Sequence, residues 1–305
     1  MRSFVRYFLA ATALSLCSQR VEAKIRVVTT TPDLAAIAQA VGGSRVEVQS
    51  IAKGYQDPHY VAAKPSYMRT LNRADLLLYT GLELEVAWLP LLIQGARNPK
   101  VVLGADGHLD ASEGVPVLEV PTGQVDRSMG DIHPEGNPHY MLNPRNGLIV
   151  AETITERLEA LFPRDAELFR GNLVTFREFL TRKIEAWEAR IAGLRGRQIV
   201  TYHTQWEYLA DWLGLAIAEH VEDKPGIPPS PRHIASLVER MKSDSIEILV
   251  CSATADVKRA TKVAERTGAR LVVLPISVGG EPTIETYADL FDTIVSRLEG
   301  ASAAD

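Results

Sequence analysis

Hydrophobic residues in this chain occur alternately in short continuous runs and at helical spacing. The run KIRVVTTT (24–31) is apolar and β-branched, whereas PDLAAIAQAVGG (32–43) spaces its apolar residues three or four apart and closes on two glycines. A short continuous run is typical of a buried strand, and the spacing that follows it is typical of an amphipathic helix. The fold is therefore predicted to begin with a strand followed by a helix.

The same alternation continues through the first half of the chain. Further strands are predicted at VEVQSIA (46–52), ADLLLYTG (74–81) and KVVLGAD (100–106), and further helices at PSYMRTLNRA (65–74) and VAWLPLLIQGA (86–96). Nearly continuous apolar strands separated by helices indicate a parallel sheet covered on both faces.

A second set of alternating elements begins after residue 196. Strands are predicted at RQIVTYH (197–203), LAIAEHVE (215–222), IEILVCSA (246–253) and RLVVLPIS (270–277), separated by helices at 207–215, 230–243 and 255–269. The sequence thus predicts an α/β protein with two similar lobes, each a mainly parallel sheet flanked by helices.

One long helix is predicted between the lobes. Apolar residues recur three or four apart from Pro163 near its start to Gly196 at its end, and only Gly171 interrupts the pattern. About thirty helical residues at 1.5 Å each extend about 45 Å, which is long enough to span both lobes. We therefore divide the chain into an N-terminal lobe (24–162), a rigid linking helix (163–196) and a C-terminal lobe (197–305).

The first 23 residues are typical of a secretory signal. MRSFVR is basic, YFLAATALSLC is apolar, and VEA places small residues before a cleavage site after Ala23. The apolar run is too short to span a bilayer, and no later stretch approaches the roughly 20 apolar residues that a transmembrane helix needs. We expect a periplasmic protein with a cleaved signal peptide; a lipid anchor on Cys17 is the alternative.

Composition excludes several other classes. The chain has two cysteines, and cleavage of the signal leaves only Cys251, so no intramolecular disulfide is expected. Cys251 ends the apolar run IEILVC, where a thiol is typically a small buried hydrophobe. A net charge of −5 with scattered Lys and Arg gives no support for nucleic-acid binding.

Three of the seven histidines occupy loops at the ends of predicted strands or helices. His59 follows a strand in GYQDPHY, His139 lies in GNPHYMLNPRN before a predicted helix, and His203 ends RQIVTYH. Ligands of open α/β sheets gather outside the carboxyl ends of the strands, so these side chains are expected to project into a cleft between the lobes. Three imidazoles and one further ligand complete the tetrahedron that Zn²⁺ prefers.

With these residues the chain resembles a known family. DPHYVAAKPSYMRTLNRADLLLYTGLELEVAWLP, NPHYMLNPRNGLIVAETITERL, the long helix and YHTQWEYLADWLGL are similar to the periplasmic metal-binding components of zinc and manganese ABC transporters. The resemblance implies a monomeric receptor rather than an enzyme. It also implies a metal held between the lobes by His59, His139 and His203, and delivery to a membrane permease driven by a cytoplasmic ATPase.

The fourth ligand departs from the family pattern. Where many members carry an aspartate after the last strand, this chain has Ser277 in VLPISVGGEP. We rank water or Glu281 first for that position, with the loop that carries Asp126, Asp131, His133 and Glu135 as a further source; His133 alone is expected to be an exposed bystander. Asn143, which replaces the family's aspartate in its L-D-P segment, is expected to cap a helix or to support the site.

Three imidazoles favour Zn²⁺ over Mn²⁺, which prefers oxygen ligands, and such a site should also bind Cu²⁺ or Ni²⁺ in vitro. A manganese or iron receptor of the same family is the nearest alternative. A secreted zinc hydrolase using Asp57 or Glu207 as a base is less favoured, as is a surface protein in which metal serves stability alone.

Overall fold

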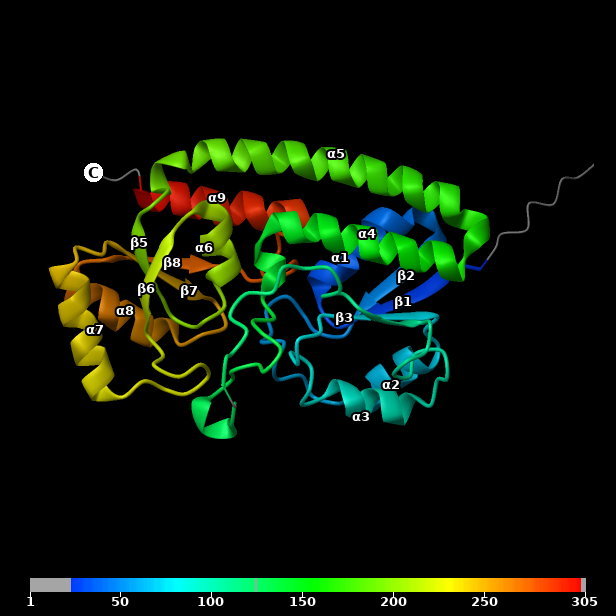
Figure 1. Cartoon of the computed structure of the whole chain (residues 1–305), viewed down its shortest axis with the longest axis horizontal. Coiled ribbons are helices and arrows are strands. Elements are labelled where there is room, and N and C mark those ends of the chain that lie inside the picture. Colours follow the sequence, from blue (N-terminus) through cyan, green and yellow to red (C-terminus); the bar gives the residue numbers. More distant parts are fainter. Residues whose placement is uncertain (1–22, 124, 303–305) are drawn as a thin grey trace, which may run out of the picture.

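The computed structural model describes residues 23–123 and 125–302, and it contains two parallel four-stranded sheets in two lobes (Figure 1). The predicted signal segment lies outside the described residues, apart from Ala23. Among the described helices, none is both long enough and apolar enough to cross a membrane. The two predicted α/β lobes are therefore confirmed.

In the N-terminal lobe, helices cover both faces of the first sheet. The strands are β1 (Ile25–Thr29), β2 (Val46–Ser50), β3 (Leu76–Tyr79) and β4 (His108–Asp110), in the order β2-β1-β3-β4. The helices α1 (Pro32–Gly42) and α4 (Pro144–Leu161) cover one face, and α2 (Pro65–Asn72) and α3 (Leu89–Ala96) lie on the other. Adjacent residues of β1 alternate between these faces: Val27 packs with the α1 side and Val28 with the α2 side.

The C-terminal lobe repeats this arrangement. Its strands are β5 (Gln198–Thr201), β6 (Ala216–His220), β7 (Ile248–Ser252) and β8 (Arg270–Leu274), in the order β6-β5-β7-β8. The helices α7 (Pro231–Ser243) and α8 (Val257–Thr267) pack on one face, and α6 (Glu207–Leu213) and α9 (Tyr287–Ser302) on the other. Cys251 is buried on the α7 side, as its apolar run predicts.

The long helix α5 (Ala166–Arg190) runs along both lobes (Figure 1). Its 25 residues extend about 37 Å, shorter than predicted, because 3₁₀ turns at Pro163–Asp165 and Ala192–Leu194 occupy the two ends. Phe169 and Trp187, near opposite ends of α5, belong to one hydrophobic cluster that includes residues of both sheets. The helix is therefore part of a core that the lobes share.

The C-terminal helix α9, which the sequence patterns above did not single out, lies beside α5. The Phe291 ring of α9 lies 5.4 Å from both the Trp187 ring and the Trp212 ring, measured between centroids. Asp292 accepts hydrogen bonds from Trp187 Nε1 and Lys183 Nζ, each 2.7 Å long. This helix therefore ties α5 to the C-terminal lobe.

The predicted strand at 100–106 is wrong. Residues 101–106 form turns in which Gly104 has a φ of 82°, and Leu103 is 83% exposed. The strand that pairs with β3 is instead β4, slightly later in the chain. The left-handed turn explains the shift, because an apolar run that includes it cannot continue in extended conformation.

Replacing the buried Trp187 tests the shared core. Trp187→Ala removes a large side chain that is 1% exposed, so we expect the free energy of unfolding to fall by about 3 to 5 kcal/mol. Phe179→Ala is the matched control on the same helix, because Phe179 is 42% exposed. Urea unfolding at equilibrium measures both, and equal losses in the two variants would contradict a core that runs along α5.

Candidate metal centre

His59 lies in the loop after β2, where the N-terminal lobe meets its partner lobe. A Cβ atom on Gly54 would lie 2.0 Å from the Val278 carbonyl oxygen. Only glycine therefore allows this loop to approach the chain after β8 so closely. His59 is 9% exposed, and its backbone nitrogen donates to Asp57 Oδ1 over 3.0 Å. The loop GYQDPHY thus holds the imidazole at the boundary between the lobes.

His139 and His203 reach the same place from two other segments. His139 precedes the 3₁₀ turn Tyr140–Leu142, and its backbone nitrogen donates to Asn137 Oδ1 over 2.9 Å. His203 follows β5, and its Nδ1 lies 2.8 Å from Glu222 Oε2. Asn143 accepts from the Arg145 backbone nitrogen at the start of α4, which confirms its expected capping role.

The three predicted imidazoles surround one cavity. Their ring centroids are 5.2 Å apart for His59 and His139, 5.9 Å for His139 and His203, and 6.2 Å for His59 and His203. The rings line a cavity of about 300 Å³ together with Asp57, Asp131 and Glu222. Imidazoles that share one tetrahedral ion have centroids about 5 Å apart. The His203 ring therefore lies about an ångström too far from the His59 ring for both to share an ion.

A fourth histidine completes this group. His133 Nε2 lies 3.2 Å from His59 Nε2, and the two ring centroids are 5.2 Å apart. Two nitrogens bound to one tetrahedral ion are about 3.3 Å apart. The prediction that His133 is an exposed bystander is wrong, because its ring is half-buried against His59. No local sequence pattern could reveal this, since the contact joins residues 74 positions apart.

Over residues 23–123 and 125–302, no three His, Cys, Asp or Glu side chains form a group that could hold a metal. The centroid distances imply that the His203 ring would move inward by about an ångström to share one ion with His59.

Carboxylates hold two of the rings from behind. Asp57 Oδ1 lies 2.8 Å from His59 Nδ1, as Glu222 Oε2 does from His203 Nδ1. With each Nδ1 acting as donor, each Nε2 keeps its lone pair for a metal. Burial alone would raise the pKa of Asp57, but hydrogen bonds and charge from His59 outweigh it and lower that pKa below its usual value.

Burial and mutual repulsion keep two of the imidazoles, His133 and His139, uncharged. Burial, with repulsion from His59, lowers the pKa of His133 to about 4, and the same causes hold the pKa of His139 well below its usual value. A metal ligand must be a neutral imidazole. These two side chains are therefore already in the form that binds metal at neutral pH.

The loop that carries His133 bridges both lobes. The Tyr60 hydroxyl donates to Asp131 Oδ2 over 2.9 Å, and the Asp131 backbone nitrogen donates to the Pro225 carbonyl over 2.8 Å. Lys224 Nζ donates to the Ser128 carbonyl over 2.9 Å. Burial, together with Asp131, raises the pKa of Tyr60 to about 12. Hydrogen bonds to both lobes thus fasten this bridge, which we call the His133 loop (residues 125–136), and the hydrophobic clusters include none of its described residues.

Ser277, which stands where an aspartate is expected, and Glu281, a candidate for the fourth position, both have other partners. Ser277 Oγ donates to Asp33 Oδ2 over 2.8 Å, and the Val278 backbone nitrogen donates to Asp33 Oδ1 over 2.9 Å. Glu281 accepts from Arg297 over 2.7 Å and does not line the cavity. Burial raises the pKa of Asp33 to about 6. The serine that replaces the family's aspartate therefore joins the lobes through a buried carboxylate.

The remaining histidines have structural partners. His108 Nδ1 lies 2.9 Å from the Val101 carbonyl, His220 Nδ1 lies 2.7 Å from Thr201 Oγ1, and His233 Nε2 lies 2.9 Å from the His220 carbonyl. None of the three lines the cavity.

Two lobes, a long connecting helix and an imidazole-lined cavity define the class of metal-binding receptors, and comparisons with known proteins agree. The family model described as zinc-uptake complex component A, periplasmic, matches residues 27–301. The chain belongs to this family, whose members are the substrate-binding components of metal ABC transporters and work with a permease and an ATPase.

The similar curated proteins are named as substrate-binding lipoproteins of manganese or metal ABC transporters. The manganese ABC transporter substrate-binding lipoprotein PsaA of Streptococcus pneumoniae is 28% identical over 76% of this chain and 73% of its own. The metal ABC transporter substrate-binding lipoprotein FimA of Streptococcus parasanguinis is 28% identical over 92% of this chain and 90% of its own.

Solved structures agree with the fold. A crystal structure of ZnuA has a TM-score of 0.76 at 21% identity, covering 92% of this chain and 100% of that one. A manganese-bound periplasmic metal-binding protein from Candidatus Liberibacter asiaticus has a TM-score of 0.75 at 23% identity, covering 91% and 99%.

The lowered histidine pKa values predict a loss of stability in acid. Between pH 6.5 and 4 the unfolded chain protonates His133 while the folded chain does not, so protons favour unfolding as the pH falls. His133→Gln should remove part of this dependence. Urea unfolding of the metal-free protein at pH 7 and pH 4.5 measures the effect, and an identical pH dependence in the variant and the parent would contradict it.

Proposed function

We propose that the protein is a periplasmic receptor that binds Zn²⁺ in the cleft between its lobes and delivers it to an ABC permease for import. The observation that carries this proposal is the gathering of four imidazoles from both lobes and from the His133 loop: His59, His139 and His203 line one cavity, and His133 lies against His59. The ion is cargo, so it must be held tightly and still be released.

Four nitrogen ligands are proposed: the three predicted histidines, His59, His139 and His203, with His133 in the fourth position. The 3.2 Å separation of the His59 and His133 Nε2 atoms supports His133. Glu281, which the sequence ranks first together with water, is less suited, because its carboxylate is paired with Arg297. Water remains the alternative fourth ligand.

A receptor role fits these residues better than hydrolysis does. A zinc hydrolase needs a carboxylate free to act as a base beside a metal-bound water. Of the two candidates, Asp57 is hydrogen-bonded to His59, and Glu207 does not line the cavity.

Export to the periplasm is part of the proposal. Because the similar streptococcal proteins are named lipoproteins, sequencing the N-terminus of the exported protein should decide between Lys24 and Cys17 as its first residue.

Substitutions separate the two candidates for the fourth ligand. His59→Ala, His139→Ala and His203→Ala should each reduce zinc affinity more than Glu222→Gln, which removes the negative charge behind His203 and should cost about ten- to a hundredfold. His133→Ala should weaken binding clearly, whereas Glu281→Gln should leave it unchanged. Zinc titration by calorimetry measures these effects, with His233→Ala as the control.

The opposite order for His133→Ala and Glu281→Gln would restore Glu281 as the ligand. If neither variant loses zinc affinity, water is favoured as the fourth ligand. If zinc binding survives all three substitutions at His59, His139 and His203, the proposed site is wrong.

Metal preference forms a separate test. Because nitrogen ligands favour Zn²⁺ while Mn²⁺ prefers carboxylate and water oxygens, zinc should displace manganese from the protein. Competition titrations of the two ions measure the ratio of affinities. Tighter binding of manganese than of zinc by the parent would overturn the assignment of zinc.

A further inference from the structure

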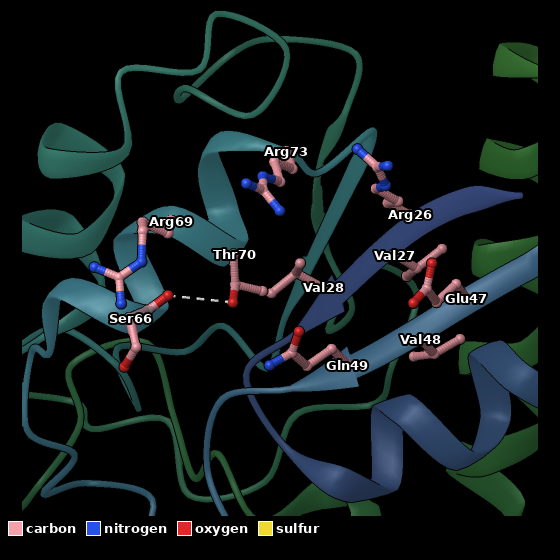
Figure 2. Close-up of a pocket in the computed structure, with 10 residues that line it drawn as sticks. All are labelled: Arg26, Val27, Val28, Glu47, Val48, Gln49, Ser66, Arg69, Thr70 and Arg73. Atoms are coloured by element: carbon pink, nitrogen blue, oxygen red, sulfur yellow. Dashed lines mark hydrogen bonds between the residues drawn. The ribbon is translucent and has the colours of Figure 1, made fainter. Parts of the chain in front are cut away.

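A second cavity, of about 530 Å³, opens on the N-terminal lobe between α2 and the strands β1 and β2 (Figure 2). Its lining residues are Arg26, Val27, Val28, Glu47, Val48, Gln49, Ser66, Arg69, Thr70 and Arg73. None of them lines the histidine cavity. We call this cavity the arginine groove.

The register of the sheet explains the strand side of the arginine groove. β1 and β2 are parallel, with Arg26 opposite Glu47 and Val28 opposite Gln49, so these four side chains share one face. Val28 packs into the core beneath α2 and α3, which identifies that face as theirs. Glu47 and Gln49 on the edge strand nevertheless remain exposed. The helices therefore leave part of the sheet uncovered.

The helix side of the arginine groove is one face of α2. Ser66, Arg69, Thr70 and Arg73 follow the spacing i, i+3, i+4, i+7, which places them in one row along a helix. Figure 2 shows Arg69 on this helix, Arg73 directly after its last residue, and Arg26 on the strand beyond, around the same hollow. Three guanidinium groups from two elements thus surround one cavity.

These three guanidinium groups are not neutralised by the protein. Within the described part of the chain, Arg26, Arg69 and Arg73 make no side-chain ion pair or hydrogen bond. The nearby carboxylate of Asp75 is engaged by Lys100 Nζ at 2.7 Å and by the Arg26 backbone nitrogen at 3.0 Å. Glu47 is the only carboxylate among the lining residues. The groove is therefore positive in a chain whose net charge is −5.

We propose that the arginine groove binds a small molecule that carries two or more anionic oxygen groups, such as phosphates or carboxylates. Guanidinium groups bind these oxygens with paired hydrogen bonds, and arginine is the usual residue for such recognition. Ser66 and Gln49 add polar donors. The cavity volume is within the range of small-molecule sites.

The anionic groups have two conceivable sources, a soluble polyanion and the headgroup of a phospholipid. Inorganic pyrophosphate probes the first source, and vesicles of phosphatidylglycerol in phosphatidylcholine probe the second. Both are tested on the full chain freed of metal and of chelator, since pyrophosphate itself binds metal ions. His59→Ala should bind the same probe unchanged, which separates this site from the proposed metal centre.

The decisive comparison is between two double variants with the same change in charge. Arg69→Gln/Arg73→Gln should weaken binding of the bound probe at least about tenfold. Arg182→Gln/Arg266→Gln, which removes two exposed arginines elsewhere, should weaken it far less. Calorimetry measures pyrophosphate binding, and vesicle sedimentation measures lipid binding.

Binding of pyrophosphate with no vesicle binding assigns the site to a soluble polyanion, and vesicle binding alone assigns it to a phospholipid headgroup. When both probes bind, displacement of the protein from vesicles by pyrophosphate shows that they share the groove, and no displacement overturns the proposal. It is also overturned if neither probe binds or if the two double variants behave alike.

Discussion

The hydrophobic core shared by the two lobes is the constraint on which the candidate metal centre depends. Side chains from both sheets belong to one cluster, and α5 and α9 lie along it. A close-packed interior resists continuous deformation. The distance from His59 and His139 in one lobe to His203 in the other is therefore set by this core. The inward shift that an ion requires is a matter of side chains and loops.

Between the lobes that this core holds in place, the side chains that lie closest together in the cleft are imidazoles. Carboxylates stand behind His59 and His203, where they orient the rings and leave the Nε2 atoms facing the cavity. The buried Asp33 accepts hydrogen bonds from Ser277 and from the Val278 backbone nitrogen in the other lobe. This carboxylate therefore has a structural role and is not available as an oxygen ligand for Mn²⁺, which fits the proposed preference for zinc.

Much of the fold could be predicted from the sequence, because apolar periodicity and glycine or proline breaks are local signals. Seven of the eight strands lie within predicted runs, while the run at 100–106 failed because its valines precede a left-handed turn at Gly104. The three histidines at element ends were predicted for the same local reason. His133 and Glu281 could not be placed, since their partners His59 and Arg297 are distant in sequence.

The His133 loop differs from the segments that carry His59, His139 and His203 in how it is attached to the rest of the protein. His59, His139 and His203 stand on segments anchored in packed lobes, whereas the His133 loop is held across the cleft by bonds such as that from Tyr60 to Asp131. Breaking a few polar bonds is a smaller barrier than separating a packed core. The residence time of a bound ion would then be governed by the loop, while its equilibrium affinity rests mainly on the three anchored rings. A permease that contacts only this loop would then speed dissociation of the ion without separating the two lobes.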